Sequence, residues 1–335
     1  MSFVTHLNQA LEGGELPEKT YQIVLQLYES YASSMELSGF QMKNYDHLFD
    51  ALLMLMIKHL KTPFHFEAYH KRILHPYDYF QFGIEFIRPL VDQQCSHVLG
   101  MHNVQKISQQ LQAGENAILF ANHQTEVDPQ LMSISLEKSY PDIGENVIFV
   151  AGDRVLTDPM AVPFSMGRNL LCIYSKRHID NPPEKKEEKL QHNQRTMQRM
   201  KELLSEGGKC IYVAPSGGRD RPNAEGEVTV APFDPQSIEM FRLMAKQAHK
   251  PVHFYPLSLV TFDILPPPPS VESELGETRS AKREGSLFFY GDEIDMENFP
   301  GSEITDRHEK RSARAHFIYN LVNANYRFLK QGGFS

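Results

Sequence analysis

Two patterns of hydrophobic positions divide the chain at about residue 75. Before that point, apolar residues recur at the three- and four-residue spacing of a helix, first over 21–28 and then over 48–57. Thr62-Pro63 closes the second of these predicted helices, because the residue before a proline is disfavoured in the α conformation. We therefore predict a small N-terminal helical domain over residues 1–75, with helix across most of it.

From about residue 76 onward, short apolar runs are separated by longer polar segments. The runs are rich in β-branched and aromatic residues and lie at 116–121, 147–151, 170–174, 210–214 and 252–260. Helical periodicity marks the segments 184–205 and 237–249, and a strand at 286–290 and a helix around 306–329 follow. Wholly apolar strands that alternate with helices are typical of a mainly parallel sheet. The predicted fold class is α/β, with a mainly parallel or mixed sheet covered by helices on both faces over residues 76–335.

Composition excludes several classes of function. The 335 residues are 41% hydrophobic and 23% charged, and the formal net charge of -8 argues against a nucleic-acid binder, whose affinity comes largely from neutralised phosphates. The longest wholly apolar run, 51–57, is far shorter than the ~20 residues that span a bilayer, so no transmembrane span is expected. Three glutamates and no arginine in the first twenty residues argue against a signal or transit peptide on this sequence. The three cysteines lack metal-ligand spacing and are expected to be buried thiols in a reducing compartment.

The loop after the first apolar run is a candidate catalytic site. In parallel sheets ligands bind beyond the carboxyl ends of the strands, and here residues 122–129 contain His123 and Asp128. A carboxylate that accepts a hydrogen bond from one imidazole nitrogen leaves the other as a base, which can act directly on a substrate hydroxyl. On spacing alone the alternative stays open that Asp128 only caps the helix begun by Pro129, and that His123 is an ordinary loop residue.

Two further loops bring basic residues to the same predicted edge. After the run at 210–214, Gly217 and Gly218 would let the backbone approach a ligand, and Arg219 and Arg221 would present guanidinium groups to a phosphate. The alternative is a plain glycine-rich turn in which Asp220 pairs with its arginine neighbours. After the run at 170–174 come Lys176, Arg177 and His178, which alone would also fit a solvated charge cluster.

The distribution of charge favours the phosphate hypothesis. Residues 176–221 contain eleven Lys and Arg and seven Asp and Glu, a net charge of +4, while the rest of the chain carries -12. A local basic region of this kind is what a phosphate-bearing substrate requires. Further candidates for lining the pocket are Lys176, Ser216, Gly217, Gly218 and Arg168. The loop after 147–151 offers Asp153 and Arg154, for which mutual pairing is the structural alternative.

Four blocks of sequence, in this order, resemble the soluble, plastid-type glycerol-3-phosphate acyltransferases. They are HQTEVD at 123–128, GRNLLCIYSKRH at 167–178, APSGGRDRP at 214–222 and PVHFYPLSL at 251–259. The H-x4-D block is shared by glycerolipid acyltransferases in general, whereas PSGGRDRP is specific to this branch. Many membrane-bound relatives have Pro-Glu-Gly where this chain has Pro215-Ser216-Gly217. The helical front and the segment 263–268 fit as well, so the resemblance covers most of the chain.

The resemblance implies acyl transfer from a thioester to the sn-1 hydroxyl of glycerol 3-phosphate, which gives lysophosphatidate. It implies that His123 is the general base, that Asp128 orients it, and that Arg219 and Arg221 bind phosphate together with Arg177 and His178. Arg177 replaces the family's lysine, which keeps the charge but changes reach and fork geometry. Acyl-acyl carrier protein or acyl-CoA would be the co-substrate and acyl carrier protein the partner, with no cofactor and no metal.

Two other classes of function stay open from the sequence. The first is a non-catalytic module that binds phosphoglycerides or an acyl carrier, although a binder has no need of the base His123. The second is a metal-dependent phosphoester hydrolase using His123, Asp128 and Asp153, for which further metal ligands are lacking. We expect a cytoplasmic protein, or a mature protein of the plastid stroma as the alternative. Transient peripheral contact with a membrane would serve product release.

Overall fold

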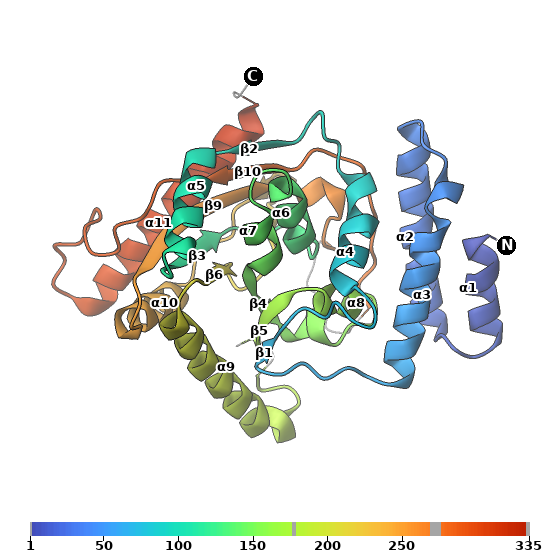
Figure 1. Cartoon of the computed structure of the whole chain (residues 1–335), viewed down its shortest axis with the longest axis horizontal. Coiled ribbons are helices and arrows are strands. Elements are labelled where there is room, and N and C mark those ends of the chain that lie inside the picture. The colour runs from blue at the N-terminus through green and yellow to red at the C-terminus, as the bar shows by residue number, and fades with distance from the viewer. Residues whose placement is uncertain (1, 176–178, 269–275, 333–335) are drawn as a thin grey trace.

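The computed structural model describes residues 2–175, 179–268 and 276–332. Within these ranges the centre is an eight-stranded mixed sheet with the order β1-β5-β4-β6-β3-β9-β10-β2 (Figure 1). Its strands are β1 Tyr69–His70, β2 His97–Leu99, β3 Asn116–Ala121, β4 Ile148–Gly152, β5 Asn169–Ile173, β6 Cys210–Val213, β9 Val252–Val260 and β10 Leu287–Tyr290. The five central strands from β5 to β9 are mutually parallel, so their carboxyl ends share one edge. A separate hairpin consists of β7 Arg221–Pro222 and β8 Val228–Thr229.

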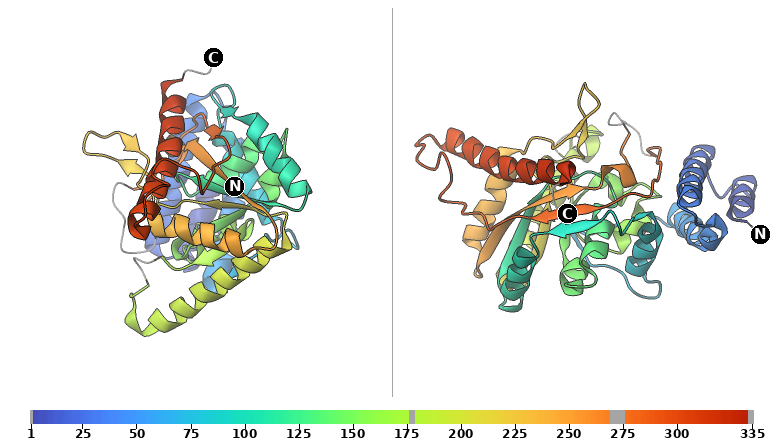
Figure 2. Two further views of the ribbon diagram at one scale, coloured as in Figure 1. Left: turned by 90° about the vertical axis from the view of Figure 1, so that its left-hand side faces the viewer. Right: turned by 90° about the horizontal axis from the view of Figure 1, so that it is seen from above.

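Helices cover both faces of this sheet. The α-helices are α1 Phe3–Glu12, α2 Glu18–Leu37, α3 Asp46–Lys61, α4 Tyr79–Ile87, α5 Met101–Gln112, α6 Asp128–Leu136, α7 Pro141–Asn146, α8 Val162–Met166, α9 Lys186–Glu206, α10 Pro235–Gln247 and α11 Arg307–Gln331. Short 3-10 helices are η1 Met42–Asn44, η2 Arg88–Leu90, η3 Asp153–Leu156, η4 Pro183–Lys185 and η5 Phe262–Ile264. One face packs against α9, α10 and α11, and the other against the layer that contains α5 and α6 (Figures 1 and 2).

The side chains of β3 explain why both faces need helices. Every residue of this strand is buried, yet successive side chains enter different cores. Leu119 and the residues two positions before and after it pack in the core that includes α5 and α6. Ile118 and Phe120 pack in the core that includes α9, α10 and α11, where Phe120 stacks on Phe254 with ring centroids 5.6 Å apart. The predicted α/β class, with a mainly parallel sheet covered on both faces, is confirmed.

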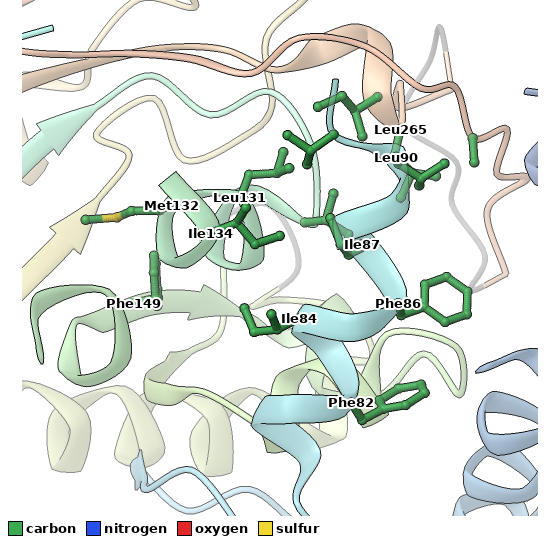
Figure 3. Close-up of a cluster of buried hydrophobic side chains, with 14 of the residues drawn as sticks. Phe82, Ile84, Phe86, Ile87, Leu90, Leu131, Met132, Ile134, Phe149 and Leu265 are labelled. Carbon is green, nitrogen blue, oxygen red and sulfur yellow. The ribbon is translucent and has the colours of Figure 1, made fainter. Parts of the chain in front are cut away.

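Helix α4 joins the N-terminal helices to the sheet layers. Helices α1–α3 form a layer at one end of the molecule (Figure 2). In Figure 3, Phe82 and Phe86 point toward that layer, while Ile84 points toward Ile134 of α6. Phe86 lies 4.9 Å from Phe49 between ring centroids and accepts a hydrogen bond at its main-chain oxygen from the Tyr31 hydroxyl, at 3.0 Å. The N-terminal helices are therefore packed on the layers around the sheet through a shared aromatic core.

The predicted helix end at Thr62-Pro63 is confirmed, since α3 ends at Lys61, but the helical character expected for the rest of the first seventy-odd residues is wrong. The chain from 62 to 78 is extended and contributes β1, which pairs antiparallel with β5. Prolines at 63 and 76 interrupt this stretch, so a continuous helix is not available to it. The sheet thus begins before residue 76, and the division into 1–75 and 76–335 stays a prediction. Cys95 is exposed rather than buried, whereas Cys172 and Cys210 are buried.

The periodicity also missed the helices α4, α5, α7 and α8 and the short strands β1, β2, β7 and β8. In the described part of the chain, no helix combines the length and the apolar character needed to cross a bilayer.

Candidate active site

Loops from four adjacent strands meet at the carboxyl edge of the sheet. His123 follows β3, Arg219 and Arg221 follow β6, Arg154 follows β4, and Thr261 follows β9 directly. The strands are neighbours in the order β4-β6-β3-β9, so residues far apart in sequence converge there.

The predicted pair of His123 and Asp128 is in contact. His123 Nδ1 lies 2.8 Å from Asp128 Oδ2, and because an ionised carboxylate only accepts, Nδ1 donates. The acceptor nitrogen Nε2 is thereby left for a substrate proton. The Asp128 side chain is 1% exposed, while that of His123 is 28% exposed. The arrangement combines a buried, fixed carboxylate with a base that solvent and ligand can reach.

Asp128 faces back toward the loop rather than into its own helix. Helix α6 begins at Asp128, and its N-cap residue is Val127, without a side-chain cap. Asp128 Oδ2 instead accepts from the backbone amides of Gln124 at 2.8 Å and Thr125 at 3.2 Å. Asp128 Oδ1 accepts from the Thr261 hydroxyl at 2.6 Å. These donors hold the carboxylate in the orientation that binds His123.

Asp220 ties the histidine loop to the arginine loop. Its backbone amide donates to the His123 main-chain oxygen at 2.6 Å. Its fully buried carboxylate accepts from the side-chain amides of Asn122 at 2.8 Å and Gln124 at 3.2 Å, and from the Ala231 amide at 2.9 Å. Burial raises the pKa of Asp220 to about 6, although these hydrogen bonds favour its charged form. The glycine-rich-turn alternative predicts that Asp220 pairs with its arginine neighbours. The carboxylate instead binds groups of the neighbouring loops and so stabilises the fold of the site.

The two candidate phosphate arginines are held by the segment that follows β9. Arg219 Nη2 donates to Glu277 Oε2 at 2.5 Å, and Arg221 Nη1 donates to the main-chain oxygen of Pro268. Gly217, at φ +67°, makes the turn that precedes them, and a side chain there would be strained. The Ser216 hydroxyl donates to the Gly218 main-chain oxygen at 2.9 Å, which tightens the same turn.

A buried ion-pair network, absent from the sequence prediction, braces the histidine loop. Glu126 lies between His123 and Asp128 in the sequence, and its carboxylate accepts hydrogen bonds from both Nε and Nη2 of Arg279. Arg279 Nη2 also lies 3.2 Å from Asp158 Oδ2. Burial would raise the pKa of Glu126, but Arg279 holds it below its usual value. Burial would likewise lower the pKa of Arg279, but Glu126 and Asp158 raise it, so the network is charged.

Some predicted residues are not brought to this edge, and others cannot be placed. Lys176, Arg177 and His178 lie outside the described residues. Arg168 precedes β5 and therefore lies at the opposite, amino edge of the parallel strands, where it donates to the Ser133 hydroxyl at 2.6 Å. Its guanidinium carbon lies over the ring of Phe80, 4.7 Å from the ring centroid. This placement gives no support to the prediction that Arg168 lines the substrate pocket.

The sequence analysis missed several residues of the site, and only some of them could have been found from their position. Asn122 and Gln124 flank His123, and Thr261 follows a predicted strand, so all three lie at the ends of predicted strands. Glu277 and Arg279 lie some 150 residues from the histidine, outside any motif. In the described chain, no three side chains of His, Cys, Asp or Glu are grouped as metal ligands. A surface groove of 690 Å³ between α9 and residues 67–69 has none of the predicted site residues in its lining.

Comparison with known proteins relates these features to characterised families. The family described as Acyltransferase matches residues 98–260. A chloroplastic glycerol-3-phosphate acyltransferase of Arabidopsis thaliana is 38% identical over 330 residues, which cover 96% of this chain and 71% of that protein. The chloroplastic enzyme of Pisum sativum is 39% identical over 327 residues, covering 97% and 71%. The solved 1-acyl-sn-glycerophosphate acyltransferase PlsC of Thermotoga maritima has a TM-score of 0.42 and 18% identity, with 75% of this chain and 78% of that chain covered.

Proposed function

Because this chain belongs to the family of the chloroplastic glycerol-3-phosphate acyltransferases and is an acyltransferase, we propose that it acylates the sn-1 hydroxyl of glycerol 3-phosphate. The family resemblance predicted from four sequence blocks is confirmed. The acceptor is supported by the names of the relatives, and the sn-1 position by the sequence resemblance alone. The product of this reaction is lysophosphatidate.

The observation that carries the mechanism is the hydrogen bond from the Asp220 amide to the His123 main-chain oxygen, at 2.6 Å. It fixes the base beside a loop whose neighbouring residues, Arg219 and Arg221, are cationic. A small acceptor with a phosphate at one end and a hydroxyl at the other fits this arrangement, because the arginines bind the phosphate and the hydroxyl then lies near His123.

The reaction proceeds by direct attack, without a covalent acyl-enzyme. His123 Nε2 takes the proton of the sn-1 hydroxyl while the oxygen attacks the thioester carbonyl, and Asp128 stabilises the imidazolium that forms. The tetrahedral intermediate collapses with cleavage of the carbon–sulfur bond, and the departing thiolate receives the proton from His123. Ser216 takes no part as a nucleophile, since its hydroxyl is engaged with the Gly218 main-chain oxygen.

The co-substrate is acyl-acyl carrier protein or acyl-CoA, and no cofactor or metal takes part. Acyl carrier protein is the proposed protein partner, and product release involves a transient peripheral contact with a membrane. Arg177 and His178 complete the phosphate site in this proposal. The compartment stays a prediction, cytoplasmic or the plastid stroma, and the chloroplastic relatives favour the second.

The test supplies purified protein with glycerol 3-phosphate and, in parallel, acyl-acyl carrier protein or acyl-CoA, and follows lysophosphatidate by mass spectrometry with analysis of the acylated position. We expect the sn-1 product, with the better donor identified by its kcat/KM. Glycerol without phosphate should be a poor acceptor, because it lacks the anion that the arginines bind. Absence of product with both donors would contradict the proposal and favour a binding module.

A further inference from the structure

The connector between β9 and β10 returns two charged residues to the active site. In its described part, Glu277 and Arg279 stand two positions apart, and their side chains are 7% exposed each. Neither belongs to a sequence block that carries the family resemblance. Their contacts all lead to loops at the carboxyl edge of the sheet.

Glu277 holds two arginines that come from different strands. Its Oε2 lies 2.5 Å from Arg219 Nη2, and its Oε1 lies 3.3 Å from Arg154 Nη2. Arg219 follows β6 and Arg154 follows β4, and these strands are adjacent. One carboxylate therefore keeps two guanidinium groups side by side that would otherwise repel each other.

Arg279 fixes the backbone from which Glu277 projects. It binds both oxygens of Glu126, lies 3.2 Å from Asp158 Oδ2, and donates from Nη1 to the main-chain oxygen of Glu277 at 3.0 Å. Because Glu126 belongs to the loop of His123 and Asp128, the connector is braced against that loop. The position of the Glu277 carboxylate is thus coupled to the position of the catalytic base.

The contact with Glu277 leaves Arg219 capable of binding a second anion. A guanidinium has five N–H donors in a planar fork, and the bond to Glu277 uses one nitrogen, Nη2. The Arg219 side chain is 16% exposed and retains access to a ligand. A buried carboxylate behind an arginine restricts the guanidinium to one orientation, so less conformational entropy is lost when a phosphate binds.

We propose that Glu277 is a positioning residue that holds Arg219, together with Arg154, for the phosphate group of the acceptor and thereby sets the affinity for that acceptor. The inference rests on the proposed function. Glu277 acts through the arginines and touches no reacting atom, so its effect falls on acceptor binding. Saturating acceptor should compensate for its loss, and binding of the acyl donor should be unaffected.

The test compares wild type with Glu277→Gln and Glu277→Asp, and with Glu284→Gln as the matched control. Glu284 is in the same connector, is partly exposed and pairs with Lys282 rather than with an arginine of the site. For Glu277→Gln we expect KM for glycerol 3-phosphate to rise about tenfold, equivalent to ~1.4 kcal/mol, with kcat and the KM of the acyl donor within about twofold. Glu277→Asp, which keeps the charge, should recover part of the loss, and the control should match wild type.

Calorimetric titration with inorganic phosphate and with glycerol 3-phosphate measures the same effect without turnover. Weaker binding of both by Glu277→Gln, in a protein with wild-type circular dichroism, supports the inference even if the acylation assay fails. Unchanged or tighter binding would overturn it, and tighter binding would identify Glu277 as a competing anion. A fall in kcat together with a changed donor KM would also overturn it, because that outcome indicates general damage to the site.

Discussion

At the scale of single residues, the environment of Asp128 decides what His123 can do. The carboxylate accepts hydrogen bonds from His123, Gln124, Thr125 and Thr261, so both of its oxygens are engaged. Hydrogen bonds to a charged group are strong, and together they restrict the rotation of the carboxylate. The histidine then has one orientation and one tautomer, with Nε2 directed away from Asp128 as the available base.

Removal of the hydroxyl of Thr261 tests this orientation directly. Thr261→Val deletes the donor to Asp128 Oδ1 and leaves shape and backbone nearly unchanged. We expect kcat to fall about tenfold, because a hydrogen bond to a charged group contributes ~1.5–3 kcal/mol and only part of this orients the base. The KM of glycerol 3-phosphate should change less than about twofold.

Thr196→Val is the matched control for that experiment. Its hydroxyl is also buried and donates at 2.6 Å, but to the main-chain oxygen of Cys172 on β5. The control should lose stability and retain kcat. An equal loss of kcat in both variants would show that the effect at Thr261 is one of stability, and would contradict an orienting role.

Asp220 makes the stability of the protein depend on pH. Its pKa is raised to about 6 by burial, above the usual value of about 3.9. The folded protein therefore binds this proton more tightly than the unfolded chain, and the contribution of Asp220 to stability is greatest below about pH 4 and is lost as the pH rises through about 6. The free energy of unfolding is measured with urea for wild type and Asp220→Asn. Relative to the variant, wild type should lose about 3 kcal/mol as the pH rises over that range. A difference independent of pH would contradict the raised pKa.

Sequence spacing predicted the candidate residues that meet at the carboxyl edge better than the residues that hold them in place. His123, Asp128, Arg219 and Arg221 were identifiable because each lies in a loop directly after an apolar strand. Glu277 and Arg279 were not, because their partners lie more than 50 residues away and no local pattern records a long-range ion pair. The alternative in which Asp220 pairs with its arginine neighbours is wrong, because the backbone turns its carboxylate inward, toward Asn122 and Gln124.

At the scale of secondary-structure elements, buried strands and long amphipathic helices were predictable and short elements were not. The predicted runs at 116–121 and 252–260 coincide with β3 and β9. The two- and three-residue strands β1 and β2 are too short for periodicity, and they depend on neighbouring strands for their hydrogen bonds. Helix α4 is only nine residues long, and its exposed side carries just Gln81 and Glu85, so its polar face is too narrow for the periodicity to mark.

Helix α4 should carry much of the energy that joins the N-terminal helices to the rest. Phe86 is 2% exposed and contacts the rings of Tyr31 and Phe49 on one side and Phe164 on the other. Phe86→Ala should lower the free energy of unfolding by about 3–5 kcal/mol, because it leaves a cavity between two packed layers. The measurement is urea denaturation followed by circular dichroism.

Leu37→Ala is the control, since this side chain on α2 is 87% exposed and should change stability by less than ~0.5 kcal/mol. Equal and small losses in both variants would contradict the role of α4 as the joint.

At the scale of the whole molecule, net charge is a poor guide to what the active site binds. The chain is acidic overall, yet the adjacent ends of β4 and β6 bring Arg154, Arg219 and Arg221 to one edge. Part of the excess positive charge counted over 176–221 lies on α9. There Arg199 pairs with Glu202 and Glu206 and adds nothing to the site. Topology, which brings selected arginines to this edge, therefore decides where they gather, and the sum of charges along a segment does so less.

The most direct test of the central claim compares His123→Ala with wild type at saturating glycerol 3-phosphate and acyl donor. We expect lysophosphatidate formation to fall by about 10²–10⁴, the usual contribution of a general base. Calorimetric binding of glycerol 3-phosphate should stay within about threefold, since Arg219 and Arg221 remain in place. The exposed-histidine control His47→Ala should retain the wild-type rate. Full activity of His123→Ala would contradict the account.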